Sequence, residues 1–197
     1  MIGIIDYGAG NLYSVQKALN YLGLANALIR APDDLAGCDK LLLPGVGHFG
    51  SAMLHLRSSG LLFELEKWLR AERPFLGICL GMQLLFSGSE EAPDCRGIDF
   101  FKGQVRQYTY RPRLQIGWNL VRANRQSAVW QNEICEYFYY VNGYYVIPDD
   151  RGIVVGFSDY GCDFAAAVQY GAIWAVQFHP EKSAAAGLEL LRRWGIS

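Results

Sequence analysis

The first half of the chain alternates short apolar runs with longer segments of helical period. The runs expected to form buried strands are at residues 2–6, 27–30, 40–43 and 74–78. Helices are expected at 12–22, 50–69 and 184–194. Asn11 is placed to cap the first of these helices. Strand–helix alternation of this kind predicts an α/β fold with three layers, in which helices cover both faces of a mostly parallel central sheet.

After residue 90 the pattern changes to short, aromatic-rich segments separated by turn residues. The expected strands are at 104–110, 118–122, 136–146, 153–158 and 165–169. Their aromatic and β-branched content predicts additional antiparallel strands. The sequence has no internal repeat, low-complexity tract or linker, so we expect a single domain over residues 1–197.

Composition excludes several classes of partner. The 197 residues are 51% hydrophobic, and 18 Lys and Arg against 19 Asp and Glu give a net charge of -1. This balance provides no bulk attraction for nucleic acid or a membrane surface. No apolar run approaches the ~20 residues that a membrane span needs. The first segment turns polar at Asp6, so no secretory leader is expected.

The five cysteines are odd in number and widely spaced, without a Cys-x-x-Cys pair. This arrangement argues against a disulfide framework and against a zinc site. We therefore expect no bound metal and a cytoplasmic location.

One of these cysteines, Cys79, has the surroundings of a nucleophile. It ends an apolar run and has a glycine two residues before it, Gly77, and two residues after it, Gly81. Such glycines allow a sharp turn from strand to helix that presents the nucleophile at its corner. The N-terminus of the helix expected from Leu80 favours a reactive thiolate.

A nucleophilic thiol needs a proton acceptor, and the chain has three histidines. His55 lies in a segment that indicates an ordinary surface helix. His179 ends an apolar run and precedes Pro180, which places it at the end of a strand. In extended chain Glu181 points to the same side as His179, so its carboxylate can reach the imidazole. Cys79, His179 and Glu181 thus form a candidate triad.

The same chemistry needs donors for the negative charge on an attacked carbonyl. A loop with Gly45, Val46 and Gly47 follows the apolar run at 40–43, and its glycines permit backbone N–H groups to turn toward a substrate. Together with the N–H of Leu80, this loop is a candidate oxyanion hole. Thiol, imidazole, carboxylate and backbone donors suffice for amide cleavage, so no cofactor is expected.

A glycine-rich segment at 8–13 follows a strand and opens a helix, as a dinucleotide fingerprint does. Tyr13 replaces the last glycine of that fingerprint, which argues against a nucleotide cofactor.

The elbow at 77–83, the Pro-Gly-Val-Gly loop at 44–47 and Gln-Phe-His-Pro-Glu at 177–181 together resemble class I, triad-type glutamine amidotransferases. Asp-Tyr-Gly-Ala-Gly-Asn-Leu at 6–12, Gly-Trp-Asn at 117–119 and Glu-Lys-Ser at 181–183 are similar to the glutaminase subunits of imidazole glycerol phosphate synthases. The resemblance spans essentially the whole chain.

The resemblance implies that Cys79 attacks the carboxamide of L-glutamine, that His179 relays the proton to ammonia and that Glu181 orients His179. It also implies that Gln83 contacts the bound glutamine and that the 44–47 loop reorients before it supplies oxyanion donors. The positions that it implies face a partner subunit are Asn11, Tyr139 and Lys182. That partner is a cyclase, which receives the ammonia and closes an imidazole ring in histidine biosynthesis.

Two departures from the family pattern leave the partner open. Leu114, Gln115 and Ile116 stand where relatives usually have Pro-His-Met, and Val-Asn-Gly at 141–143 stands where they usually have Val-His-Ser. A glutaminase that serves a sugar amidotransferase in surface-polysaccharide synthesis is therefore an alternative. A stand-alone cysteine hydrolase and a non-catalytic partner-binding protein are alternatives of other classes.

Overall fold

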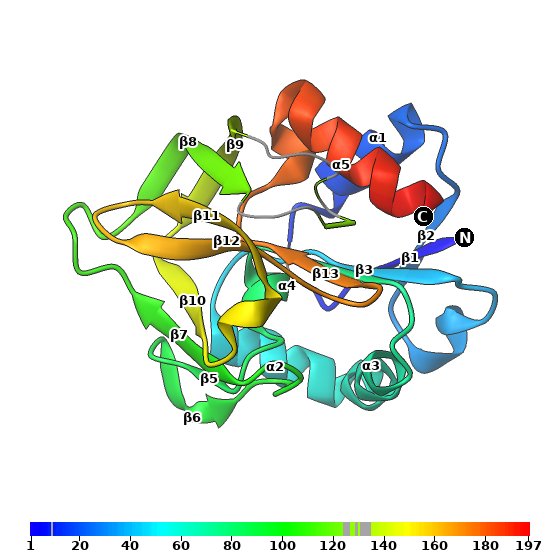
Figure 1. Ribbon diagram of the computed structural model, residues 1–197. Helices are drawn as coiled ribbons and strands as arrows, with labels where there is room; N and C mark the ends of the chain where they lie inside the picture. Colours follow the sequence, from blue (N-terminus) through cyan, green and yellow to red (C-terminus); the bar gives the residue numbers. More distant parts are fainter. Residues whose placement is uncertain (9, 124–126, 129, 131–134) are drawn as a thin grey trace.

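The computed structural model describes residues 1–8, 10–123, 127–128, 130 and 135–197 (Figure 1). Its main sheet has nine strands in the order β2-β1-β3-β4-β13-β12-β11-β8-β9. The first five in this order are parallel to one another. Their bounds are Asn26–Ile29, Ile2–Ile5, Lys40–Leu43, Phe75–Ile78 and Ile173–Val176.

Helices cover both faces of this parallel part, as the alternation of strands and helices predicts (Figure 1). One face carries α1 (Leu12–Tyr21) and α5 (Ala184–Ile196), which pack on Ile4 and Leu76. The other carries α2 (Phe49–Ser58) and α3 (Leu61–Arg70), which pack on Ile5, Leu41 and Phe75. Successive strand residues thus enter opposite cores, because side chains alternate along a strand.

The aromatic-rich half adds antiparallel strands, as expected. The main sheet continues through β12 (Asp163–Tyr170), β11 (Val154–Asp159), β8 (Gln115–Ala123) and β9 (Cys135–Asn142). A second sheet has the order β10-β7-β5-β6. Its strands are Tyr144–Pro148, Gly103–Gln107, Gly88–Ser89 and Ala92–Arg96. Short 3-10 helices lie at Pro32–Leu35 (η1), Arg151–Ile153 (η2) and Pro180–Lys182 (η3).

The structure corrects two expected elements. The helix expected over 50–69 is two helices, because Gly60 adopts a left-handed conformation (φ 76°) between α2 and α3. The strand expected over 136–146 breaks at Gly143. Asn142 pairs with Gln115 in the main sheet, whereas Tyr144 pairs with Gln107 in the second. The chain therefore changes sheets at this glycine.

The order of the parallel strands brings distant segments to one edge. Leu43 of β3 and Val176 of β13 lie on either side of the end of β4, beside Gly77 and Ile78. The chain that follows β3, β4 and β13 therefore emerges at the same carboxyl edge, where sites of open α/β sheets are built. In the described part of the chain, no helix is both long and apolar enough to span a membrane.

Candidate active site

Cys79 occupies a strained corner between β4 and the short helix α4 (Leu80–Gln83). Its backbone has φ 53° and ψ −107°, a conformation that a residue with a side chain rarely adopts. The glycines on either side are required by close packing. A Cβ on Gly77 would lie 2.8 Å from the carbonyl oxygen of Gly81, and one on Gly81 would lie 1.9 Å from that of Leu43. The structure thus has the elbow that the glycine spacing predicts.

His179 and Glu181 lie side by side at the end of β13. Nδ1 of His179 is 2.8 Å from Oε1 of Glu181, and each side chain is 2% exposed. The backbone N–H of His179 donates to the carbonyl oxygen of Tyr139 (2.8 Å), which ties this segment to β9. The contact between imidazole and carboxylate expected from the sequence is present, but its reason differs, because Glu181 lies in the 3-10 helix η3 and not in the extended chain that the sequence argument assumed.

The charge state of His179 reflects opposing effects. Burial disfavours the imidazolium and by itself lowers the pKa of His179. The negative charge of Cys79 and the hydrogen bond and charge of Glu181 outweigh burial, and they raise the pKa of His179 to about 10. Nε2 of His179 has no well-formed hydrogen bond to any described residue. Cys79 therefore acts on the imidazole chiefly through its charge.

The candidate oxyanion loop lies beside the elbow, but one of its expected donors is occupied. The N–H of Leu80 donates to the carbonyl oxygen of Gly45 (3.4 Å). Gly45 packs so closely that a Cβ there would lie 2.6 Å from the hydroxyl of Tyr7. Val46 and Gly47 line the cavity next to Cys79, and Gly47 has φ 108°. The loop is in place, and its Gly45 carbonyl must turn away before the Leu80 N–H can bind an oxyanion.

A cavity of about 370 Å³ opens onto Cys79. The side chains at its wall include Gln83, Glu91, Arg113 and Asn142. Gln83 is engaged within the protein, because its Nε2 donates to the carbonyl oxygen of Tyr144 (3.0 Å) and to Oε1 of Gln177 (3.1 Å). The residue that the resemblance assigns to glutamine binding thus lies at the cavity in a hydrogen-bonded position.

The three residues expected to face a partner occupy neighbouring elements. Asn11 accepts the N–H of Ser14 (3.3 Å) and caps α1, as expected from the sequence. Nζ of Lys182 in η3 lies 5.9 Å from the ring centre of Tyr139 on β9. The Tyr139 ring in turn meets that of Trp118 edge to face, with centres 6.0 Å apart.

The departures from the family pattern are linked to one another. Gln115 and Asn142 pair across β8 and β9, and both are buried. The hydroxyl of Tyr108 donates to Oε1 of Gln115 (3.2 Å) and accepts from Nδ2 of Asn142 (3.0 Å). Ile116 points the other way and is 63% exposed. Gln115 and Asn142 therefore belong to one internal network, whereas Leu114 and Ile116 are exposed.

Sequence reasoning missed several residues at the site, Arg113 on the cavity wall among them. The amide of Gln177 contacts Cys79, the hydroxyl of Tyr7 is buried without a hydrogen bond to any described residue, and Glu91 accepts the N–H of Phe49 at the start of α2 (2.7 Å). Gln177 and Tyr7 stand within the quoted motifs, so their positions were visible, but their contacts depend on tertiary packing.

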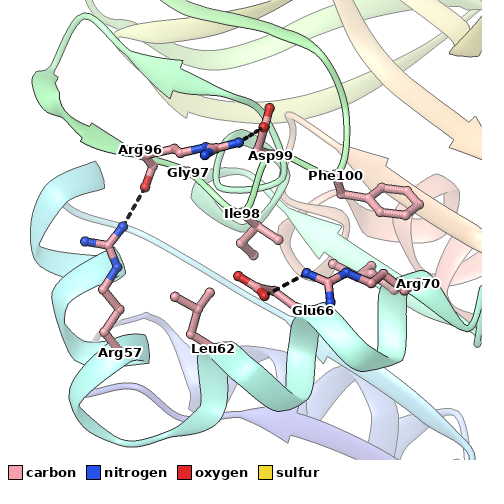
Figure 2. Close-up of a pocket in the computed structure, with 10 residues that line it drawn as sticks. Arg57, Leu62, Glu66, Arg70, Arg96, Gly97, Ile98, Asp99 and Phe100 are labelled. Atoms are coloured by element: carbon pink, nitrogen blue, oxygen red, sulfur yellow. Dashed lines mark hydrogen bonds and ion pairs between the residues drawn. The ribbon is translucent and has the colours of Figure 1, made fainter.

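A larger cavity, about 460 Å³, lies elsewhere, between α2, α3 and the segment after β6 (Figure 2). Its cations are engaged: Arg70 pairs with Glu66 (3.1 Å), Arg96 with Asp99, and Arg57 donates to the carbonyl oxygen of Arg96 (3.1 Å). None of the site residues predicted from the sequence lines this cavity.

Comparison with known proteins identifies the family of the chain. The family Glutamine amidotransferase class-I matches residues 3–196. Solved structures share the fold at low identity: a glutamine amidotransferase crystal structure (TM-score 0.78, 18% identity, 98% of each chain) and PurLQS from Thermotoga maritima (TM-score 0.80, 17% identity, 98% of this chain and 96% of that one). The chain belongs to the class I glutamine amidotransferase family.

Curated relatives show which group within this family the chain resembles. Imidazole glycerol phosphate synthase subunit HisH of Moorella thermoacetica is 42% identical over 98% of this chain and 93% of its own length. The HisH subunit of Geobacillus kaustophilus is also 42% identical, over 98% and 95%. Within the class I family, the chain therefore belongs with the HisH subunits.

Proposed function

We infer that this chain is the glutaminase subunit of an imidazole glycerol phosphate synthase in histidine biosynthesis. It hydrolyses L-glutamine to glutamate and ammonia and passes the ammonia to a cyclase subunit. The observation that carries the chemistry is the convergence of Cys79, His179 and Glu181 at one edge of the sheet. The close relationship to HisH subunits supports the pathway.

The geometry supports a definite order of steps. The Cys79 thiolate attacks the carboxamide carbon of glutamine, and the oxyanion forms near Leu80 and the loop at 44–47. His179 gives its proton to the leaving ammonia, while Glu181 holds the imidazole in orientation. Water then attacks the glutamyl thioester with His179 as base, and glutamate leaves.

The cavity supports an amino-acid substrate with both α-groups charged. Glu91 provides a carboxylate for an α-ammonium group, and Arg113 provides a guanidinium for an α-carboxylate. Both lie on the wall of the same cavity as Cys79 and Gln83. This combination favours glutamine over an ester or a simple amide, which lacks the two charges.

An exposed aromatic face beside the site supports docking of the cyclase. Trp118 and Tyr137 on β8 and β9 are 54% and 59% exposed, on the face that carries Tyr139. Exposed aromatic clusters next to a site are typical of protein interfaces. We assign Asn11, Tyr139 and Lys182 to this interface, next to the segment that ends at His179.

We also propose that residues 1–197 act as one glutaminase domain and that the protein works in the cytoplasm without nucleic acid. All five cysteines are unpaired, which suits a reducing compartment. The nearly neutral charge offers no electrostatic footprint for nucleic acid.

The test is to co-purify the chain with a cyclase subunit and to measure glutamate release with the cyclase's precursor present. We expect turnover that depends strongly on the partner and is lost in Cys79→Ala, with binding of the partner retained. Stimulation by a sugar amidotransferase in place of the cyclase would overturn the pathway. Turnover of other amides without a partner would overturn the glutaminase assignment.

A further inference from the structure

The side chain of Gln177 lies against the reacting sulfur. Gln177 follows β13, is fully buried and is held by a hydrogen bond from its N–H to the carbonyl oxygen of Ala166 (2.9 Å). Its Nε2 is 3.5 Å from Sγ of Cys79, within reach of an N–H···S hydrogen bond.

The orientation of the Gln177 amide is fixed by its neighbours. The carbonyl oxygen of Tyr144 can only accept, so the group of Gln83 that faces it (3.0 Å) must be the NH₂. The same NH₂ lies 3.1 Å from Gln177, which must therefore present its carbonyl oxygen there. The NH₂ of Gln177 is left facing the sulfur.

The sulfur thus has a different partner in each protonation state. A neutral thiol can donate to the carbonyl oxygen of Val141 (3.9 Å). A thiolate can only accept, and Gln177 offers the N–H that it needs. A hydrogen bond to the charged form of a group favours that form.

We propose that Gln177 is a catalytic residue whose side-chain N–H binds the Cys79 thiolate, and that Gln83 holds it in this orientation. The N–H stabilises the sulfur before attack. It does so again when water has added to the thioester and the C–S bond breaks with its electron pair going to sulfur. Because Gln83 lies at the substrate cavity, the state of the sulfur is linked to the residue expected to meet glutamine.

Other groups around Cys79 also affect its charge. His179 faces it from the end of β13, with Glu181 behind the imidazole, and Tyr7 faces it from the chain after β1. Glu91 and Arg113 are the charged side chains on the cavity wall. A test must therefore change Gln177 alone and leave these groups in place.

The test is the pH profile of Cys79 alkylation by iodoacetamide in the full chain, followed by mass spectrometry of the Cys79 peptide. Gln177→Glu keeps the shape of the side chain and replaces its N–H donor with an acceptor. Gln177→Leu removes both the donor and the acceptor. In both variants we expect the midpoint of the alkylation profile to move up by at least about one pH unit. The alkylation rate at pH 7 should fall about tenfold. Gln104→Leu, at an exposed position on β7, is the matched control and should leave the profile unchanged.

A second measurement uses the wild-type side chain, so it does not depend on the variants folding. The ¹⁵N resonance of the Gln177 side-chain amide should move with the same midpoint as the alkylation profile, and the movement should vanish in Cys79→Ala. An alkylation midpoint unchanged in both folded Gln177 variants, or an amide resonance that ignores the Cys79 titration, would overturn the proposal.

The inference about Gln177 rests on the proposed function only where it concerns attack on glutamine and breakdown of the thioester. Loss of partner-stimulated glutamate release in the wild type would overturn the proposed function and leave the alkylation result intact. Normal release with an unmoved alkylation profile would overturn the role of Gln177 alone.

Discussion

The carbonyl oxygen of Gly45 accepts the backbone N–H of Leu80 at 3.4 Å, so an expected oxyanion donor is occupied from within. We expect slow glutamine hydrolysis by the isolated chain, because one missing oxyanion donor typically costs 10²–10³-fold in kcat. Binding of the cyclase should raise kcat by at least about 10²-fold and change KM less. Steady-state glutamate release with and without the partner measures this. An isolated chain as fast as the complex would show that the closed loop does not limit turnover.

Glu181→Gln tests the orienting role of the carboxylate. The amide fills the same space but can present its NH₂ to Nδ1 of His179, which favours the wrong tautomer. We expect kcat of the complex to fall by about 10²-fold or more, with an unchanged circular dichroism spectrum. Glu189→Gln, on α5 with its side chain 41% exposed, is the control and should retain full activity. Equal activity of both variants would remove Glu181 from the triad.

The protonation of His179 is predicted to depend more on Cys79 than on Glu181. Its pKa is raised to about 10, so the imidazolium should persist from neutral pH up to that range. Cys79→Ala removes the larger raising effect and leaves burial, which lowers the pKa, so His179 should lose its proton at a clearly lower pH. Glu181→Gln should give a smaller fall. NMR titration of the His179 side chain measures its pKa in the wild type and in the two variants. A larger fall in Glu181→Gln than in Cys79→Ala would contradict the assignment.

The sequence was sufficient for the elements and residues whose placement depends on local rules. The glycines around Cys79 predict the elbow, and the spacing of His179 and Glu181 predicts their contact. The parallel strands follow from apolar runs alternating with helical segments. What could not be predicted depends on which strands become neighbours. The change of sheet at Gly143 is such a case. The left-handed Gly60 was missed for another reason, because the helical period of the apolar residues continues across it from α2 to α3.

The same limit applies to the site. The occupied Leu80 donor and the Gln83–Gln177 chain of amides arise only once β3, β4 and β13 are adjacent. The sequence also left open a sugar amidotransferase partner and a stand-alone hydrolase. Similarity to HisH subunits over nearly the whole chain, rather than any local motif, favours the histidine pathway.

Tyr7→Phe tests a buried polar group near Cys79. Burial, followed by the nearby charge of Cys79, raises the pKa of the Tyr7 hydroxyl, which has no hydrogen bond to a described residue. Removing an unpaired buried hydroxyl should leave the free energy of unfolding unchanged or raise it by about 1 kcal/mol. Urea denaturation measures this. A loss above about 1 kcal/mol would show that the hydroxyl has a partner in solution.

The pairing of Gln115 with Asn142 through Tyr108 predicts energetic coupling where the chain departs from the family pattern. The Tyr108 hydroxyl is buried and joins both amides, and burial raises its pKa. Tyr108→Phe should lower the free energy of unfolding by about 1–3 kcal/mol, because it leaves the two buried amide groups without this partner. Gln115→Leu should cost a similar amount by leaving the hydroxyl without its acceptor.

Both substitutions break the same hydrogen bond, so the double variant should lose less stability than the two single losses added together. We expect a coupling of at least about 0.5 kcal/mol in urea denaturation. Tyr108→Phe combined with Gln104→Leu should instead be additive, since Gln104 is exposed and has no part in this network. Additivity of the Tyr108 and Gln115 substitutions would mean that the departures are independent. Coupling would mean that a change at either position constrains the other, and so constrains Asn142 at the wall of the cavity next to Cys79.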